Sequence, residues 1–252
     1  MLKAYGVSDV GLLRRANEDR FVADEQLQLL VVADGMGGHL AGEVASTLAV
    51  ETITGFVRRS EESGECSWPY GVDPTLSFCT NRLRTAIHLA NRRVFRASEK
   101  YDEYTGMGTT VVCALFSGAR LAVGHAGDSR LYVLRNRELV QLTVDDTWEA
   151  TILPDQADST IQAPSSMRHV LTNVLGARDC ADVHLCEHEL LGGETVLLCS
   201  DGLHGAVDNQ ELCGLLSGDD PLDEIGARLI DAALKKGGRD NVTVVLGRYD
   251  GS

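Results

Sequence analysis

The order of the predicted elements favours an α+β fold with two mostly antiparallel sheets covered by helix pairs. Apolar runs typical of strands come in groups, two long helical patterns lie together after the first group, and helical patterns return only near the end of the chain. This order differs from the strand–helix alternation of a parallel sheet. The chain has 252 residues, 44% of them hydrophobic, which suits one large domain over 1–252.

The elements expected in the first hundred residues are strands followed by two helices. Strands are predicted over 2–10, 21–23 and 27–33. A helix over 41–59 follows a glycine-rich turn, and a second helix covers roughly 75–100. In both helices the apolar residues recur every three or four positions, which is typical of a helix with one buried face. We expect this pair to cover a sheet.

The middle of the chain changes to the pattern of strands. Four strands separated by turn residues are predicted at 109–116, 120–124, 130–134 and 138–142, and they indicate an antiparallel meander. Residues 143–172 then lose regular periodicity. Because long irregular segments inside compact domains are usually functional, we expect a flap over 143–172.

The last part of the chain returns to strands and ends with two helices between them. Strands are predicted at 182–188, 194–200 and 242–248. Asp208 and Glu211 have the spacing of a capping box, which predicts a short helix. Asp220-Pro221 opens a last helix that ends at Gly237-Gly238.

Charge and composition exclude several classes of protein. The formal net charge is −14, which argues against a protein that binds nucleic-acid phosphates through a basic surface. No apolar stretch approaches the roughly 20 residues that span a bilayer. Met1–Gly6 shows no signal-peptide pattern, and the seven irregularly spaced cysteines form no C-x-x-C pair. We therefore expect a cytoplasmic protein with reduced thiols and no membrane span.

Three aspartates stand at the ends of apolar runs. Asp34 and Asp201 each end such a run and precede a glycine, and Asp240 comes just before the last apolar run. Taken singly, Asp-Gly is equally well explained as a common turn pair. Taken together, the three carboxylates could converge at one sheet edge. Clustered carboxylates repel one another, so they either share protons or hold a metal ion.

Six sequence blocks that include these aspartates resemble the metal-dependent protein phosphatases, the type 2C serine/threonine phosphatases. The blocks cover residues 11–19, 34–39, 107–110, 127–130, 200–203 and 240–243. They occur in the order of that family, and the Asp-Gly-Met-Gly-Gly-His form is similar to its compact bacterial branch. The resemblance extends from about residue 4 to 248 and implies a four-layer α-β-β-α sandwich.

The resemblance implies a centre of two Mn²⁺ or Mg²⁺ ions. The Asp34 carboxylate would bridge both ions, and the backbone carbonyl of Gly35 would bind one of them. The remaining implied ligands are Asp201 and Asp240 for the other ion and, through water, Glu18 and Asp19. A hydroxide that bridges the two ions would attack phosphorus in line, without a covalent phosphoenzyme. Oxygen ligands and retained waters suit such hard ions.

Two further residues have both an implied role and an ordinary alternative. Arg14 matches the phosphate-binding arginine of the family, because a guanidinium can bind two phosphate oxygens at once. Its alternative is a surface ion pair with Glu18, and the adjacent Arg15 is also open as the phosphate ligand. Asp128 matches the position that binds a third, weaker metal together with Asp201, and its alternative is an Asx turn.

The chain departs from the family pattern at two places. Animal members have a histidine, the proposed general acid, where this chain has Met36, which cannot donate a proton. His39 follows in the glycine turn, and a metal-bound water is the alternative proton donor. Relatives often carry a histidine where this chain has Asp146. This second difference affects the flap and the substrate preference, and not the metal centre.

Other residues that suggest chemistry have simpler interpretations. His184, Cys186 and His188 alternate on one predicted strand face, but no fourth ligand for a soft metal is evident. Met107 is expected in the core. Ser200 is not expected to be a nucleophile because no G-x-S-x-G motif surrounds it.

The sequence thus predicts a metal-dependent phosphatase of phosphoserine and phosphothreonine. Its implied partners are phosphorylated proteins and a serine/threonine kinase whose action it reverses. One alternative is a non-catalytic phosphoprotein-binding module on the same fold, although Asp34, Asp201 and Asp240 are all present. The other is a metal-dependent nuclease, against which the acidic net charge argues.

Overall fold

Two sheets lie face to face in the computed structural model, which describes residues 2–38, 40–62, 67–152 and 170–251. One sheet has the order β1 (Leu2–Asp9), β11 (Val242–Tyr249), β10 (Thr195–Cys199), β7 (Arg130–Arg135) and β8 (Glu138–Gln141). The other has the order β2 (Asp19–Asp24), β3 (Leu29–Met36), β5 (Val111–Ser117), β6 (Arg120–Ala126) and β9 (His184–Glu189), and β4 (Gly108–Thr109) pairs with β3. All strand pairs within these described ranges are antiparallel.

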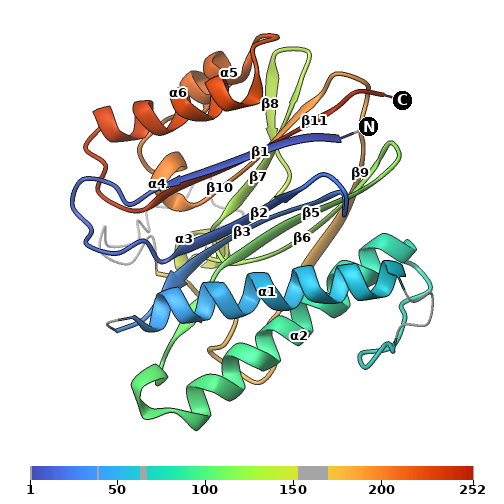
Figure 1. Ribbon diagram of the computed structural model, residues 1–252, viewed down its shortest axis with the longest axis vertical. Coiled ribbons are helices and arrows are strands. Elements are labelled where there is room, and N and C mark those ends of the chain that lie inside the picture. The colour runs from blue at the N-terminus through green and yellow to red at the C-terminus, as the bar shows by residue number, and fades with distance from the viewer. Residues whose placement is uncertain (1, 39, 63–66, 153–169, 252) are drawn as a thin grey trace.

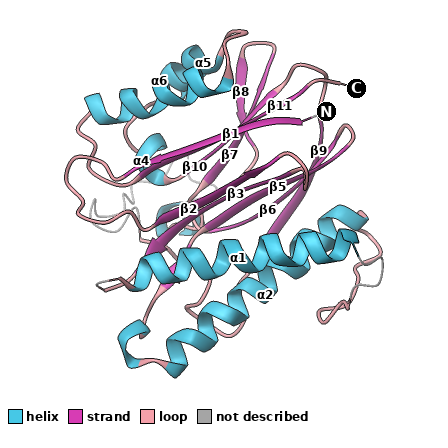
Figure 2. Ribbon diagram, viewed as in Figure 1, coloured by secondary structure: helices cyan, strands magenta, loops and turns pink. Residues whose placement is uncertain are grey.

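A helix pair covers the outer face of each sheet (Figures 1 and 2). α1 (Ala41–Glu62) and α2 (Phe78–Lys100) pack on the sheet that contains β3. α5 (Asn209–Leu216) and α6 (Leu222–Lys235) lie over the sheet that contains β1 and β11. The four-layer α-β-β-α sandwich predicted from the sequence is therefore confirmed. Within the described ranges, none of the helices combines the length and the apolar character needed to cross a membrane.

The apolar residues form three layers, and the pattern of β3 shows how. Leu29, Val31 and Ala33 pack toward α1 and α2, whereas Leu30 and Val32 lie in the core between the sheets. A strand that is buried on both faces needs apolar residues at every position, which explains its unbroken apolar run. β10 repeats this arrangement, with alternate residues in the inter-sheet core and in the layer beneath α5 and α6.

Capping residues determine the first residues of helices whose starts the apolar periodicity predicted only approximately. α2 begins at Phe78, three residues after the predicted start, because the Ser77 side chain accepts a hydrogen bond from the Thr80 amide at 3.2 Å and caps the helix. Asp208 caps α5 by accepting from the Glu211 amide at 2.9 Å, so the predicted capping position is confirmed. Periodicity missed three short helices, η1 (Asp102–Tyr104), α3 (Trp148–Ile152) and α4 (Asp201–His204).

The two ends of the predicted flap lie side by side. Thr147 forms a β-bridge with Leu171, and the Trp148 amide donates to the Val170 carbonyl at 2.8 Å. α3 continues the first of these ends. The rest of the predicted flap, residues 153–169, lies outside the described part of the chain. The flap itself stays a prediction.

Candidate metal centre

The acidic strand ends predicted from the sequence meet at one edge of the sandwich. Asp19, the first residue of β2, is paired directly with Asp34 near the end of β3. In the other sheet, β10 ends just before Asp201, and β11 begins just after Asp240. The segment 10–18 joins β1 to β2 along the same edge. Since β1 and β2 belong to different sheets, this segment passes from one sheet to the other.

The carboxylates around Asp34 affect one another through their charges. Burial raises the pKa of Asp34 well above its ordinary value, and the charges of Asp19, Asp201, Asp128 and Asp240 raise it further, in that order. The strands thus bring five aspartates together, including all three that the sequence placed at strand ends. Such a cluster needs protons or a cation to offset its mutual repulsion.

Asp19 connects the two sheets and keeps one oxygen available. Its Oδ2 accepts hydrogen bonds from the hydroxyls of Ser200 at 2.8 Å and Thr243 at 2.6 Å, both of which belong to the other sheet's strand ends. Its Oδ1 is buried and has no hydrogen-bond partner among the described residues. Burial is the main cause that raises the pKa of Asp19. A buried carboxylate oxygen without a partner fits a site for a cation or its bound water.

The backbone of Asp34 is held by two threonines. The Asp34 carbonyl accepts from the Thr110 amide and from the Thr109 hydroxyl, both at 2.9 Å, and the Asp34 amide donates to the Thr110 hydroxyl at 3.0 Å. Thr110 Oγ1 also lies 2.7 Å from Ser129 Oγ, next to Asp128. The sequence marked these residues as parts of family blocks but assigned them no role. Their role in the structure is to position Asp34 relative to Asp128.

The glycines after Asp34 and Asp201 permit close packing of backbone. A Cβ added to Gly35 would lie 2.0 Å from the Gly42 carbonyl oxygen, and one added to Gly202 would lie 2.0 Å from the Asn241 carbonyl oxygen. Gly35 lies within β3 and Gly202 within α4, and neither has a positive φ. The explanation of these two Asp-Gly pairs as turns is therefore wrong. Glycine is required because two backbone segments approach each other there.

Arg14 reaches the centre, but with a different partner from the one expected. Its Nη2 lies 2.7 Å from Oδ2 of Asp240, so the predicted alternative, an ion pair with Glu18, is wrong. The hydrogen bond to Asp240 is the main cause that raises the pKa of Arg14. The side chain is about half exposed, so its guanidinium lies at the mouth of the cluster. Arg15 is exposed, and within the described ranges no acidic partner is seen for it.

Asp128 faces the cluster from the turn between β6 and β7. It is buried, and burial raises its pKa to about 7, with the charges of Asp201 and Asp145 adding to the effect. Nε2 of His204 lies 3.0 Å from the Asp128 carbonyl oxygen and holds the turn against α4. Asp128 therefore lies close enough to Asp201 for the charge of one carboxylate to raise the pKa of the other.

Asp146, where the chain departs from the pattern of the family it resembles, has a structural role. Its Oδ2 accepts from the Gly127 amide at 2.9 Å and from the Asn173 side-chain amide at 2.7 Å. Its Oδ1 lies 2.8 Å from Nε2 of His184, whose ring stacks on that of His125. Asp146 thus joins the turn before Asp128 to the second end of the predicted flap and to β9.

The other residues singled out from the sequence have separate surroundings. Met36, at the position of the animal histidine, is 42% exposed beside the cluster, and His39 lies outside the described residues. Met107 is buried in the core, as predicted. Ser200 is buried and serves Asp19 as a hydrogen-bond donor.

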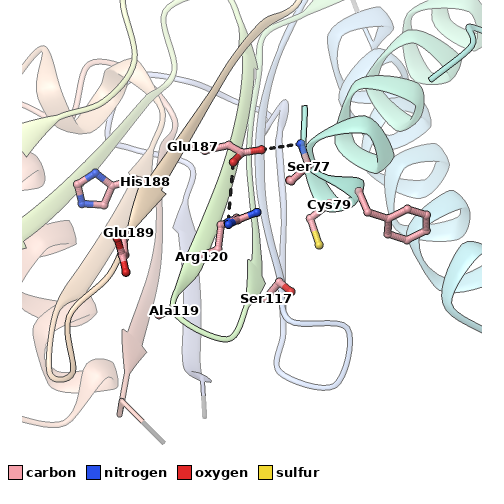
Figure 3. Close-up of a pocket in the computed structure, with 9 residues that line it drawn as sticks. Ser77, Cys79, Ser117, Ala119, Arg120, Glu187, His188 and Glu189 are labelled. Atoms are coloured by element: carbon pink, nitrogen blue, oxygen red, sulfur yellow. Dashed lines mark hydrogen bonds and ion pairs between the residues drawn. The ribbon is translucent and has the colours of Figure 1, made fainter. Parts of the chain in front are cut away.

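A separate hollow of about 540 Å³ is lined in part by β9, and none of the clustered aspartates lines it. Figure 3 shows it between the β5–β6 hairpin, β9 and the start of α2, with Glu187 facing Arg120 and the Ser77 amide. These contacts are 3.9 Å and 3.0 Å long. His188 on its rim lies 3.2 Å from Arg135, whereas His184 contacts Asp146, so the histidines of β9 point to different partners.

The carboxylate cluster is open and not a closed cage. Within the described part of the chain, no three Asp, Glu, His or Cys side chains are gathered closely enough to hold an ion by themselves. The donors at this edge are all oxygens, and Asp240 is drawn toward Arg14. Mg²⁺ and similar hard ions bind through one or two carboxylates and keep several waters, so an open set of this kind fits them.

The comparisons with known proteins identify the family. A model of the protein phosphatase 2C family matches residues 15–246. The chain belongs to the protein phosphatase 2C family. The resemblance predicted from the sequence blocks is thereby confirmed.

Relatives within this phosphatase family include bacterial serine/threonine phosphatases. The serine/threonine protein phosphatase PstP of Mycobacterium tuberculosis is 37% identical over 252 residues, which cover 98% of this chain and 45% of that protein. The serine/threonine phosphatase Stp of Listeria monocytogenes is 32% identical over 247 residues, which cover 96% of this chain and 94% of that protein. The chain thus spans less than half the length of the mycobacterial relative and nearly all of the listerial one.

A solved structure of the same family has a similar fold. The catalytic domain of PstP in complex with two manganese ions has a TM-score of 0.81 and 35% identity, with 98% of this chain and 97% of that one covered. The relatives are therefore enzymes of the class that the sequence predicted, the protein-serine/threonine phosphatases.

Proposed function

We propose that this type 2C protein is a metal-dependent phosphatase that hydrolyses phosphoserine and phosphothreonine in proteins. The observation that carries the proposal is the convergence of Asp34, Asp201 and Asp240 with Asp19 at one sheet edge, beside the Arg14 guanidinium. The names of the bacterial relatives and the two manganese ions of the PstP domain support it.

The proposed centre holds two Mn²⁺ or Mg²⁺ ions. Asp34 would contact both ions, the Gly35 carbonyl would bind one, and Asp201 and Asp240 would bind the other. Glu18 and Asp19 act through water, and Asp128 with Asp201 is the proposed place of a third ion. When bound, such ions supply a nucleophilic water at neutral pH and neutralise phosphoryl oxygens. The buried, unpartnered Oδ1 of Asp19 and the all-oxygen donor set support this assignment.

The chain's own residues orient the substrate. Arg14 binds the phosphate, because its charged guanidinium lies at the mouth of the centre and offers paired donors. Thr109 and Thr110 keep Asp34 in place through its backbone. Met36 donates no proton to the leaving group, so the proposed donor is water. Residues 1–252 are proposed to form one catalytic domain, which the contiguous apolar layers support.

The proposed partners are phosphorylated proteins and a serine/threonine kinase whose products the enzyme dephosphorylates. No described residue identifies that kinase. The cytoplasmic location expected from the cysteines and composition also stays a prediction.

The proposal is tested by hydrolysis of an aryl phosphate and a phosphothreonine peptide in Mn²⁺. Asp34→Asn and Asp201→Asn are each expected to lower kcat/KM at least 100-fold, which corresponds to about 2.7 kcal/mol of transition-state stabilisation. Asp219→Asn, a change at an exposed carboxylate away from the cluster, is the control. Full activity in either site variant would overturn the proposal. If the wild-type protein does not bind Mn²⁺ and does not turn over substrate, the non-catalytic binding module would be favoured instead.

A further inference from the structure

A groove of about 390 Å³ has two of the clustered aspartates, Asp201 and Asp240, in its lining. Gly205 and Ala206 of the α4 region also line it, together with the cationic residues Lys236 and Arg239. The glycine and alanine present no large side chain, so the groove has room for a peptide segment that follows a residue seated at the cluster.

The two cations of the groove differ in their pairing. The Lys236 ammonium forms an ion pair with Glu211 of α5. Arg239 is exposed, and no described carboxylate lies within ion-pair distance of it. Arg14, the other arginine at the cluster, is paired with Asp240. In a chain with a net charge of −14, Arg239 is thus an unneutralised cation one residue from the proposed centre.

The backbone that carries Arg239 is fastened on both sides. The Leu12 amide donates to the Gly238 carbonyl at 2.7 Å. The Asn241 side-chain amide donates to the carbonyls of Val10 and Ala16, both at 2.9 Å. These bonds tie the segment to the loop that carries Arg14. Arg239 is therefore presented at a fixed place relative to the centre, and only its side chain is free to adapt.

From the groove and the unpaired arginine we propose that Arg239 selects phosphoproteins with an anionic group near the phosphorylated residue. This inference rests on the proposed function, because the phosphorylated residue must occupy the aspartate cluster. The segment beside that residue lies in the groove, and its anionic group pairs with the Arg239 guanidinium. A carboxylate and a second phosphoryl group share the required chemistry, since both offer oxygens that match the guanidinium fork. Arg239 is thus a specificity-determining residue and not a catalytic one.

The test compares phosphothreonine peptides that differ at a single flanking position. One set places glutamate, glutamine or phosphoserine at each of the four positions on either side of the phosphothreonine. The readout is the ratio of kcat/KM for each acidic peptide to that for its glutamine counterpart. At the position that reaches the groove we expect a ratio of about five in the wild type, falling toward one at 0.5 M NaCl. The glutamate and phosphoserine arms show which anion is preferred.

Variants at Arg239 test whether the preference for acidic peptides depends on this side chain of the groove. Arg239→Gln is expected to bring the ratio to about one, and Arg239→Glu to bring it below one. Arg92→Gln, a change of an exposed arginine on α2, is the matched control and keeps the wild-type ratio. Aryl phosphate hydrolysis, measured for every variant, reports whether the centre is formed.

Two results would overturn the inference while leaving the proposed function standing. One is a wild-type ratio of one at all positions with active enzyme, and the other is an unchanged ratio in Arg239→Gln. Wild-type protein that hydrolyses neither aryl phosphate nor any peptide would overturn the proposed function, and the inference with it.

Discussion

At the scale of single residues, burial decides how the aspartates of the sheet edge are protonated. Asp34, Asp19 and Asp128 all have raised pKa values, and burial is the largest cause for each. Without a cation, each of these residues keeps its proton in the folded chain over the pH range between its ordinary pKa and its raised pKa, where the unfolded chain has lost it. Protons and metal ions therefore compete for the same oxygens, because only the deprotonated carboxylate is a ligand.

The metal-free protein is expected to lose stability as the pH rises from about 4 to about 7. The ordinary pKa of Asp128 is 3.8 and its folded value is about 7, so between these values the folded state binds the proton that the unfolded state has lost. The free energy of unfolding falls with pH wherever the folded state binds more protons. Thermal melting in EDTA at pH 5, 6 and 7 measures this slope.

Asp128→Asn is the matched variant for the pH experiment. The amide does not titrate, so its melting temperature is expected to fall less steeply over the same pH range than that of the wild type. Groups that do not interact with Asp128 titrate alike in both proteins and cancel in the comparison. Asp34 loses the charge of Asp128, which raises its pKa in the wild type, so this change flattens the slope of the variant further. Parallel curves for the two proteins would show that Asp128 does not carry the raised pKa.

At the scale of elements, Asp146 holds together segments that have little regular structure. It accepts from Gly127 in the turn before Asp128 and from Asn173 after the predicted flap, and it contacts His184 of β9. Its own carbonyl accepts from the Thr172 amide at 2.8 Å. One buried side chain therefore replaces the hydrogen bonds that a helix or sheet would supply in this region.

Asp146→Ala is expected to destabilise the protein by about 1–3 kcal/mol, because it leaves buried donors without acceptors. Asp146→Asn retains one acceptor oxygen, so its cost is expected to be smaller. Urea unfolding measures both, and Asp219→Ala at an exposed site is the control, with a change near zero. If the alanine variant were as stable as the control, the hydrogen bonds of Asp146 would not be holding this region.

The elements that the sequence predicted well are those with a long periodic pattern. The predicted bounds of the helices α1 and α2 and of the apolar strands β3 and β10 are within a few residues of the observed ones. Apolar residues that face the core recur regularly along these elements, on one face or on both. α3 and α4 are too short, at five and four residues, to show a period. The sequence did not exclude turns at the two Asp-Gly pairs. Glycine is needed at Gly35 and Gly202 because the carbonyls of Gly42 and Asn241 lie against them, and these residues are distant from the glycines in the sequence.

At the scale of the whole molecule, the candidate site is a place where the two sheets are joined. The hydrogen bonds from Ser200 and Thr243 to Asp19 connect residues 181 and 224 positions apart. Sequence blocks could mark Asp19, Ser200 and Thr243 as members of one site, but only the register of both sheets shows that they touch. The same holds for Arg14 and Asp240, which are 226 positions apart.

Because the proposed ligands come from both sheets, a bound ion would act as a cross-link of the sandwich. Asp34 lies near the end of β3 in one sheet, whereas Asp201 and Asp240 lie next to strand ends of the other. An ion that binds only the folded chain adds about 2.7 kcal/mol to the free energy of unfolding at 100 times its Kd. For a chain of this size, that increase corresponds to a rise in Tm of roughly 5–10 °C.

We therefore expect Mn²⁺ to raise the Tm of the wild type in a concentration-dependent way, and EDTA to reverse the rise. Asp240→Asn is expected to shift this dependence to higher Mn²⁺ concentrations, because it removes a charged ligand and the partner of Arg14. Asp219→Asn, which keeps the cluster intact, is expected to follow the wild type. A Tm that does not respond to Mn²⁺, or an equal response in Asp34→Asn, would mean that no ion joins the sheets at this edge. Differential scanning calorimetry at fixed pH separates these outcomes, since proton competition is then the same for every protein.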